Sequence, residues 1–399
     1  MSPARSARPD LAPQTRLILI TVAIIGFACS MPFRCLDPVV PQIAEQFRID
    51  DHEAGLVIFA FALPYALAQP ILGPIADLFG KLRTIKVCVF TLAAMLLTSM
   101  IAPTFDLLLV TRVLQGIVAG GIFPISVAVV SDVVPLQHRQ VIASRIMATS
   151  ISGNLAGAVS GGLFGDFLDW RYVMLLLSVC ITIAGIFAAV GLRGIKPPKK
   201  DIRLSTVVSG YRAIFSHRDS YICYPATFVE GMCILGITPF VATLLAQQGE
   251  TRYSIAGLCL ALFGMGGVVY ASIVGRLLPV LRERGMILLG GAVVCAVLIA
   301  IGASSPWQIE VALFLVMGTG FYIFHGSVQL YTTEISQSAR STAMAVYATS
   351  LFLGQSAGVL VYGYFLDAGD RFLTLAGSGL LFLVTGLISA SAFRPRNDT

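Results

Sequence analysis

Twelve stretches of the sequence are apolar over at least about 18 residues, the length that an α-helix needs to cross the hydrocarbon core of a bilayer. Lipid cannot satisfy open backbone groups, so helices are the expected spanning structure. The sequence therefore predicts an all-α integral membrane protein with 12 transmembrane helices. The predicted spans are Leu17–Val40, Ala54–Ile75, Ile85–Ala102, Leu107–Val130, Ile142–Phe164, Tyr172–Leu192, Tyr221–Ala246, Ile255–Gly275, Met286–Ala303, Ile309–Leu330, Ala343–Leu366 and Phe372–Phe393.

Composition agrees with a chain that lies in a bilayer. Only 12% of the 399 residues are charged, and mean hydropathy is +0.85. Soluble domains carry about 25% charged residues. The net charge of +6 arises from basic loops between the apolar segments, so it does not indicate a nucleic-acid partner.

The distribution of basic residues predicts the orientation of the spans. Of the 27 Lys and Arg residues, 21 fall in the tails and loops on one side or within the first few residues of an adjoining span, four in the loops on the other side, and two, Arg34 and Arg112, deeper within spans. Cytoplasmic loops carry the excess of basic residues. We therefore expect a multi-pass protein of the plasma membrane, a bacterial inner membrane, with both termini in the cytoplasm. The first apolar run is too long for a signal-peptide core and is expected to remain as an uncleaved helix.

The cysteine and histidine residues show no metal-site or disulfide spacing. All eight cysteines lie in apolar segments without a C-x-x-C pair, and none of the four histidines has metal-site spacing to another. We expect neither a metal nor another cofactor. An enzyme is also not expected, because no Ser/His pair or His/Asp cluster lies at a shared depth.

The longest connection divides the chain into two sets of six spans. It predicts one bundle over residues 1–195, a cytoplasmic linker over 196–220 and a second bundle over 221–399. Within the linker, Ile202 to Phe215 reads either as an interfacial helix or as a solvated basic segment.

The two sets are related by an internal repeat. Seven positions of the first half recur as the same residue 201 positions later. They are Arg139, Gly153, Ala156, Gly157, Gly162, Phe164 and Asp166, which recur as Arg340, Gly354, Ala357, Gly358, Gly363, Phe365 and Asp367. By fold analogy we expect two pseudo-symmetric bundles around a central cavity.

Charged residues within predicted spans are candidates for function, because charge is costly at membrane depth. Arg34 and Asp37 lie one helical turn apart in the first span, and Arg112 lies in the fourth. We expect Asp37 to form an ion pair with Arg112 or with Arg34. The alternative role of such a pair is only to lock the first span to the fourth.

The second half offers a different set of candidates. Glu230 lies near the middle of the seventh span as a lone carboxyl group, either a site for a cationic substrate or a second proton, or a neutral acid bonded to a helix. His325 has an intrinsic pKa suited to switching, although a packed neutral ring is the alternative. Tyr322 is a candidate substrate contact, or a core residue.

The segment between the second and third spans forms a tight turn and carries a recognisable motif. It runs from Gly73 to Lys86 and contains Gly80, a turn that a side chain would strain, and Asp77, which can pair with a neighbouring cation. It resembles the signature G-x-x-x-D-(R/K)-x-G-(R/K)-(R/K) of the major facilitator superfamily. The matching residues are Gly73, Asp77, Gly80 and Lys81, with Arg83 one place late and Leu78 and Leu82 departing from the pattern. Gly73 is expected to allow close backbone approach.

Two further motifs resemble those of the same superfamily, most closely its 12-helix drug:proton antiporters. Arg112-Val113-Leu114-Gln115-Gly116 matches the R-x-x-Q-G motif of the fourth helix, whose arginine is implicated in proton coupling. Asp37 followed by Pro38 is similar to the end of helix 1 in that family, which makes Asp37 the first candidate for protonation, with Arg112 and Glu230 as partners.

The fifth span carries glycines at four-residue spacing, which predicts a smooth face for close helix packing. This face contains Gly153, Gly157, Gly161 and Gly162. It resembles the antiporter motif G-x-x-x-G-P-x-x-G-G, with Ala158 where that motif has proline. A helix without this proline is expected to kink less.

The resemblance implies a secondary transporter that works by alternating access, as a monomer in the bilayer. Proton-coupled efflux of drugs or amphipathic metabolites is the first hypothesis, with Arg34, Glu230, Tyr322 and His325 as substrate contacts. The second is a selective carrier of a small organic acid or other metabolite, in which Arg34 beside Arg112 recognises a carboxylate.

Overall fold

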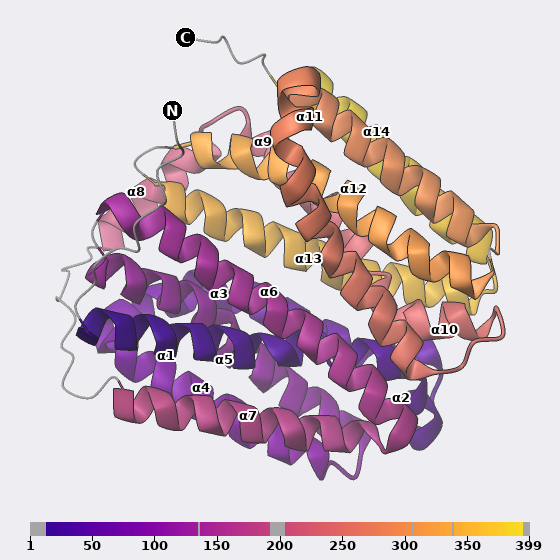
Figure 1. The fold of residues 1–399 in the computed structure, drawn as a ribbon, viewed down its shortest axis with the longest axis horizontal. Helices are drawn as coiled ribbons and strands as arrows, with labels where there is room; N and C mark the ends of the chain where they lie inside the picture. The colour runs from indigo at the N-terminus through magenta and orange to yellow at the C-terminus, as the bar shows by residue number, and fades with distance from the viewer. Residues whose placement is uncertain (1–12, 135, 192–203, 305, 337–338, 394–399) are drawn as a thin grey trace, which may run out of the picture.

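The computed structural model describes residues 13–134, 136–191, 204–304, 306–336 and 339–393. Helices dominate these ranges, and no strand occurs within them (Figure 1). The basic tail residues Arg5 and Arg8 and the predicted linker start at 196–203 lie outside the described residues.

The first half of the chain contains seven α-helices that make up six spans. They are α1 (Pro13–Ser30), α2 (Val40–Phe47), α3 (Asp51–Phe79), α4 (Lys81–Met100), α5 (Phe105–Val133), α6 (Leu136–Phe167) and α7 (Trp170–Gly191). Two 3-10 turns, η1 (Met31–Phe33) and η2 (Asp37–Val39), join α1 to α2 within the first span.

The second half repeats this arrangement after the connecting helix α8 (Leu204–Phe215). Its elements are α9 (Ser220–Glu230), the π-turn η3 (Gly231–Leu235), η4 (Thr238–Phe240), α10 (Val241–Ala246), α11 (Tyr253–Gly302), α12 (Trp307–Glu334), α13 (Arg340–Asp367) and α14 (Arg371–Ala392). The segment between Ile202 and Phe215 is therefore helical from Leu204 onward.

The prediction of 12 spans is confirmed. Ten helical segments of the described chain are long and apolar enough to cross a membrane. One of them, α11, is two helices joined at Arg282, whose φ of 53° interrupts the helix. The 32-residue helix α6 completes the set. The fold is an all-α membrane fold.

The first and seventh spans are broken, whereas the sequence predicted continuous helices there. The predicted span Leu17–Val40 stops being α-helical after Ser30 and continues through η1 and η2 to Phe47. Pro32 and Pro38 stand within these turns and cannot donate a backbone hydrogen bond, so the regular ladder cannot pass through them. Polar side chains can then reach the interior from the breaks.

Glycines bring the fifth span against the first, and the repeat reproduces this contact in the second half. A Cβ atom on Gly157 would overlap the carbonyl oxygen of Met31, and Gly153 approaches α1 in the same way. At the corresponding positions 201 residues later, Gly358 approaches the carbonyl oxygen of Met232. The glycine face of the fifth span therefore lies against the first, and the repeat extends to the contacts.

The same helix also contacts the other half. A Cβ atom on Gly161 would overlap the carbonyl oxygen of Cys35 in the first half. One on Gly162 would lie 2.5 Å from the carbonyl oxygen of Tyr253 in the second. Helix α6 therefore packs on the broken part of the first span and on α11 with adjacent glycines.

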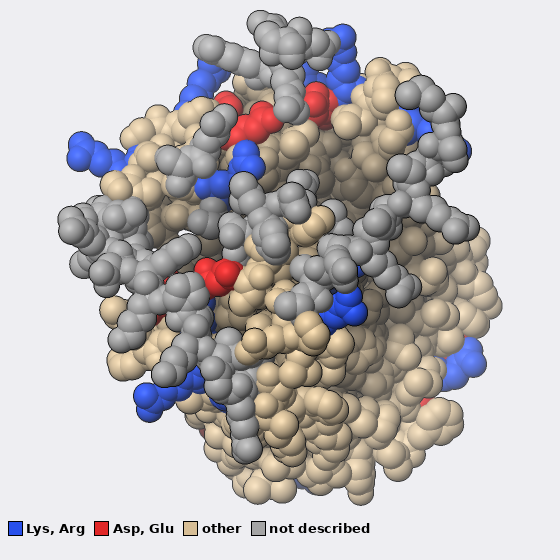
Figure 2. Space-filling view, turned by 60° about the vertical axis from the view of Figure 1, so that its left-hand side comes forward, with Lys and Arg blue, Asp and Glu red and all other residues tan. Residues whose placement is uncertain are grey.

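One end of the molecule holds α2 and α10 (Figure 1), and the halves contact each other there. At this α2/α10 end, Thr243 donates a hydrogen bond of 2.5 Å to Asp51, and backbone amides of α11 bond Asp166 of α6. At the opposite α8 end, a Cβ atom on Gly73 or Gly275 would meet no atom within 4 Å. Figure 2 brings the α8 end forward and shows basic side chains scattered across it.

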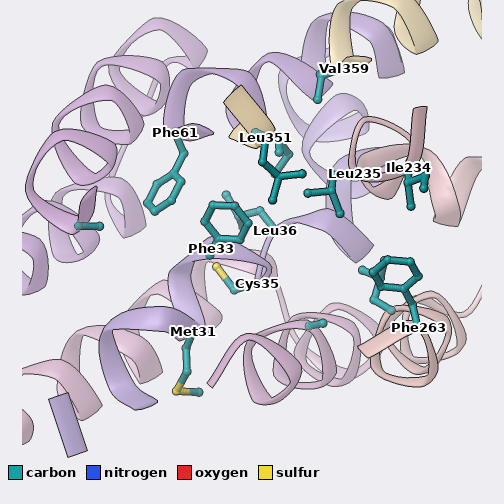
Figure 3. Close-up of a cluster of buried hydrophobic side chains, with 14 of the residues drawn as sticks. Met31, Phe33, Cys35, Leu36, Phe61, Ile234, Leu235, Phe263, Leu351 and Val359 are labelled. Carbon is teal, nitrogen blue, oxygen red and sulfur yellow. The ribbon is translucent and has the colours of Figure 1, made fainter. Parts of the chain in front are cut away.

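Apolar side chains from both halves form one buried cluster. Figure 3 shows part of it, where Phe33 and Leu36 of the first half and Leu235 and Leu351 of the second are found. Because lipid is as apolar as these side chains, close packing rather than the hydrophobic effect holds such helices together.

The glycine contacts predict a selective loss of stability. Gly157→Ala should destabilise the folded protein by about 1–3 kcal/mol, because the added methyl group overlaps backbone that cannot move independently. Gly377→Ala, in the exposed face of α14 where a Cβ meets nothing, is the matched control. Thermal unfolding in detergent measures both. Equal midpoints for the two variants would contradict the packing role.

Candidate functional site

An arginine at the break in the first span joins the two halves. Arg34 donates to Asp37 at 2.9 Å and, from the same nitrogen, to the Thr238 hydroxyl group at 2.6 Å. Asp37 is fully buried, and its second oxygen has no hydrogen-bond partner among the described residues. The predicted ion pair therefore forms with Arg34, its neighbour one turn away.

The alternative pair between Asp37 and Arg112 does not form. Arg112 is fully buried and donates to the carbonyl oxygens of Val57 (3.1 Å) and Pro32 (3.3 Å) and to Gln115 (2.8 Å). Its guanidinium lies over the ring of Phe61 at 4.3 Å. Sequence spacing can indicate a carboxylate as the partner of Arg112. It cannot indicate backbone carbonyl groups, because every residue has one. The arginine thus links α5 to α3 and to the broken part of the first span.

Glu230 is also buried, but it is not the lone carboxyl group that the sequence indicated. Its Oε1 lies 2.9 Å from Nδ1 of His325, and its Oε2 has no partner among the described residues. The Tyr347 hydroxyl group lies 3.0 Å from the same His325 nitrogen. The sequence did not indicate this contact or Tyr347. The three residues lie on different helices, α9, α12 and α13, whose packing no local pattern encodes.

Aromatic side chains line both sets of charges. Phe33 contacts Tyr65 and Phe352, with ring centroids 5.5 and 5.1 Å apart, and lies 5.0 Å below Arg34. In the second half, Phe321 stacks on His325 at 5.2 Å and meets Tyr322 edge-on at 5.1 Å. The structure therefore places Tyr322 in an aromatic group beside the Glu230 pair. The aromatic residues around Arg34 carried no distinguishing pattern in an apolar sequence.

The turn between α3 and α4 is tighter than the predicted stretch, because α3 continues to Phe79. Gly80 alone connects the helices, with a φ of +96° that favours glycine. Lys81 is the neighbouring cation that pairs with Asp77, at 3.6 Å, and it also pairs with Asp132 of α5 at 2.5 Å, a contact that the sequence did not indicate.

Two other residues of the motif make no such contacts. The expectation that Gly73 brings two backbones together is wrong for this structure, since its Cβ position faces open space. Arg83 is exposed. A glycine brings two backbones together only where another helix lies against it. At the α8 end no helix of the described chain covers the face of α3 that contains Gly73.

Two of the buried carboxyl groups each leave one oxygen open within the described ranges. Asp37 and Glu230 each present one oxygen without a partner among the described residues, where a proton can bind. No group of three or more His, Cys, Asp or Glu residues in the described chain could hold a metal ion.

Two repeat-related sets of six spans, with buried charges where the sets meet, define a membrane transporter rather than an enzyme. The chain belongs to the Major Facilitator Superfamily, whose family model matches residues 22–359.

The proteins to which this chain is similar are named for different transported substrates or for none. An uncharacterized MFS-type transporter, YfhI of Bacillus subtilis, is 24% identical over 298 residues, which cover 73% of this chain and 72% of that protein. A chloramphenicol efflux pump of Mycobacterium tuberculosis is 22% identical over 314 residues, covering 75% and 73%. The crystal structure of the nucleoside transporter NupG superposes with a TM-score of 0.76 at 13% identity, covering 94% of this chain and 100% of that one.

The contacts of Arg112 predict that lysine cannot replace it. Arg112→Lys should lower the free energy of unfolding by about 1–3 kcal/mol, because a single ammonium group cannot reach acceptors on three sides and the unmet ones stay buried. Arg83→Lys, at an exposed position, is the matched control. Thermal unfolding in detergent measures the difference, and an unchanged midpoint for Arg112→Lys would show that the backbone contacts carry no weight.

Proposed function

We propose that the protein is a proton-coupled secondary transporter that exports small amphipathic, drug-like molecules by alternating access. The observation that carries this proposal is the contact of Arg34 with both Asp37 and Thr238. It connects a buried carboxyl group, able to take up a proton, to a hydrogen bond between the two halves.

Proton uptake at this site changes the contacts that join the halves. While Asp37 is ionised, it holds Arg34 in place for Thr238 of the second half. A proton on the unpartnered oxygen removes the opposite charge, so Arg34 loses its ion pair and becomes free to turn toward water or a substrate. Arg112 keeps the surrounding backbone in position through Pro32. Protonation therefore weakens closure at the α2/α10 end.

The orientation of the molecule follows from its basic residues. Most of the Lys and Arg residues lie in the tails and loops of the α8 end, which we assign to the cytoplasm. The α2/α10 end then faces outward, and the structure is closed on that side. Both termini lie in the cytoplasm of a bacterial cell with this protein in its inner membrane, and the protein acts as a monomer.

The motif residues act during the conformational cycle. The turn at Gly80 places Lys81 between Asp77 of α3 and Asp132 of α5, and these two ion pairs fix α3 against α5 at the α8 end. The glycine face of α6 keeps the fifth span against the first while the halves move. These contacts allow each bundle to move as one body.

The substrate contacts indicate an aromatic or cationic amphipathic molecule. Glu230 with His325 provides a negative or hydrogen-bonding wall, and Tyr322 with its neighbours provides flat apolar surfaces. Similarity to a chloramphenicol efflux pump supports export of drug-like molecules. The second candidate, a carrier of a small organic acid, is supported by Arg34, which can exchange Asp37 for a substrate carboxylate.

Replacing Asp37 should abolish coupling. Asp37→Asn should reduce export of a fluorescent cationic dye from efflux-deficient bacteria by at least about tenfold, because the amide cannot take up the proton. A protonophore should abolish wild-type export as well. Asp106→Asn, an exposed carboxylate at the start of α5, should export normally. Gradient-driven export by Asp37→Asn at the wild-type rate would rule out this coupling site.

The two substrate hypotheses predict opposite sensitivities. A cationic drug should require Glu230, so Glu230→Gln should raise the dissociation constant by about tenfold and Arg34→Gln should change it little. A small organic acid should show the reverse. Thermal shift of the purified protein with each ligand class measures binding without transport. Binding that is equally sensitive to both variants would contradict either assignment.

A further inference from the structure

The last turn of α6 places a carboxylate on the first turn of a helix in the other half. We propose that Asp166 supplies the N-terminal cap that α11 lacks. We further propose that this cap, made across the halves, holds the α2/α10 end closed and sets the balance between the two transport states. The proposal requires alternating access but neither proton coupling nor a particular substrate.

The contact uses both oxygens of the carboxylate. One accepts a hydrogen bond from the amide of Tyr253 at 2.6 Å, and the other accepts from the amide of Ser254 at 3.0 Å. Gly162, one turn earlier in α6, leaves room for this approach, because a Cβ there would lie 2.9 Å from the Cα of Ser254. The carboxylate thus meets the positive end of the helix dipole and two amides without an intrahelical partner.

The first two amides of α11 have no local side-chain acceptor among the described residues, since the only backbone amide that donates to Glu250 is that of Arg252 before them. Arg252 stands at the N-cap position of the helix and makes no capping hydrogen bond from its side chain. The nearby carboxylate of Glu250 is engaged by the Arg252 guanidinium at 2.6 and 2.9 Å. By contrast, the corresponding helix of the first half, α3, is capped locally by Asp50, which accepts from the amide of Glu53 at 2.6 Å.

The internal repeat provides a natural comparison. An offset of 201 residues relates Asp166 to Asp367 and Ser254 to Glu53. Among the described residues, Asp367 accepts no hydrogen bond from α3; it lies with Asp51 on the wall of a cavity of about 190 Å³. One copy of the repeat therefore caps across the halves, and the other does not, because α3 already has its own cap.

A cap of this kind stabilises only one state. When the halves separate at the α2/α10 end, the two amides of α11 lose their acceptor, and no local side chain replaces it. Charge-assisted hydrogen bonds are among the stronger polar contacts. The free-energy cost of losing them when the halves separate therefore favours the closed arrangement. Because the contact differs between the two states, it shifts the equilibrium between them.

Hydrogen exchange followed by mass spectrometry tests the proposal on the full chain in detergent. Asp166→Ala should raise exchange in the first turn of α11 and in α2 and α10 by about fivefold or more. It should also lower exchange in residues 71–79 of α3, because the α8 end closes when the other end opens. If the alanine variant does not fold, Asp166→Asn can replace it. This variant retains one acceptor oxygen and should show an intermediate increase in exchange. Asp367→Ala should match the wild type.

A rescue variant separates capping from the link between the halves. Arg252 occupies the N-cap position of α11, so Asp166→Ala with Arg252→Ser should give α11 a local cap. Protection should return in the first turn of α11, whereas α2 and α10 should continue to exchange fast. Three outcomes would overturn the proposal: a change confined to α11 in the single variant, no change at all, or restored protection at α2 and α10 in the double variant.

Discussion

Hydrocarbon offers no hydrogen bonds, and this constraint governs both the fold and the site. It requires helices for the spans, and it makes every buried charge depend on protein partners. Arg112 binds two carbonyl groups and a glutamine through Nε and Nη1, while its Nη2 has no partner among the described residues, and Arg34 binds Asp37 and a hydroxyl group of the other half. Asp37 and Glu230 each retain an oxygen without a partner in the described chain. In the mechanism that we propose, the open oxygen of Asp37 takes up the proton.

Close backbone packing replaces the hydrophobic effect as the force that holds the helices together. Glycine faces on α6 and α13 bring these helices onto the first and seventh spans at equivalent positions of the repeat. The breaks in those two spans, at η1–η2 and η3–η4, place polar side chains between the halves. In each half, the span that packs against the glycine face is therefore also the span whose break carries the polar side chains.

The two halves share an architecture but differ in the charges they carry. The first contributes Arg34, Asp37 and Arg112, and the second contributes Glu230 with His325. The contacts across the α2/α10 end are unequal as well, since one helix start is capped locally and its counterpart by the other half. Because of such differences, opening at one end of the molecule breaks other contacts than opening at the opposite end, although the two halves are pseudo-symmetric.

Local sequence patterns determined the number of spans, the repeat and the spacing of glycines on the fifth span. Each depends on apolar length, a fixed offset or one helical turn, and the chain carries that information in neighbouring residues. They also limited the Asp37 pair to two alternatives, of which the tertiary structure selected one. The backbone partners of Arg112, the contact of Glu230 with His325, and the cap on α11 were decided by the tertiary structure alone. These contacts join residues that are 55 to 95 positions apart, and their distances depend on how whole helices pack, which no local spacing encodes.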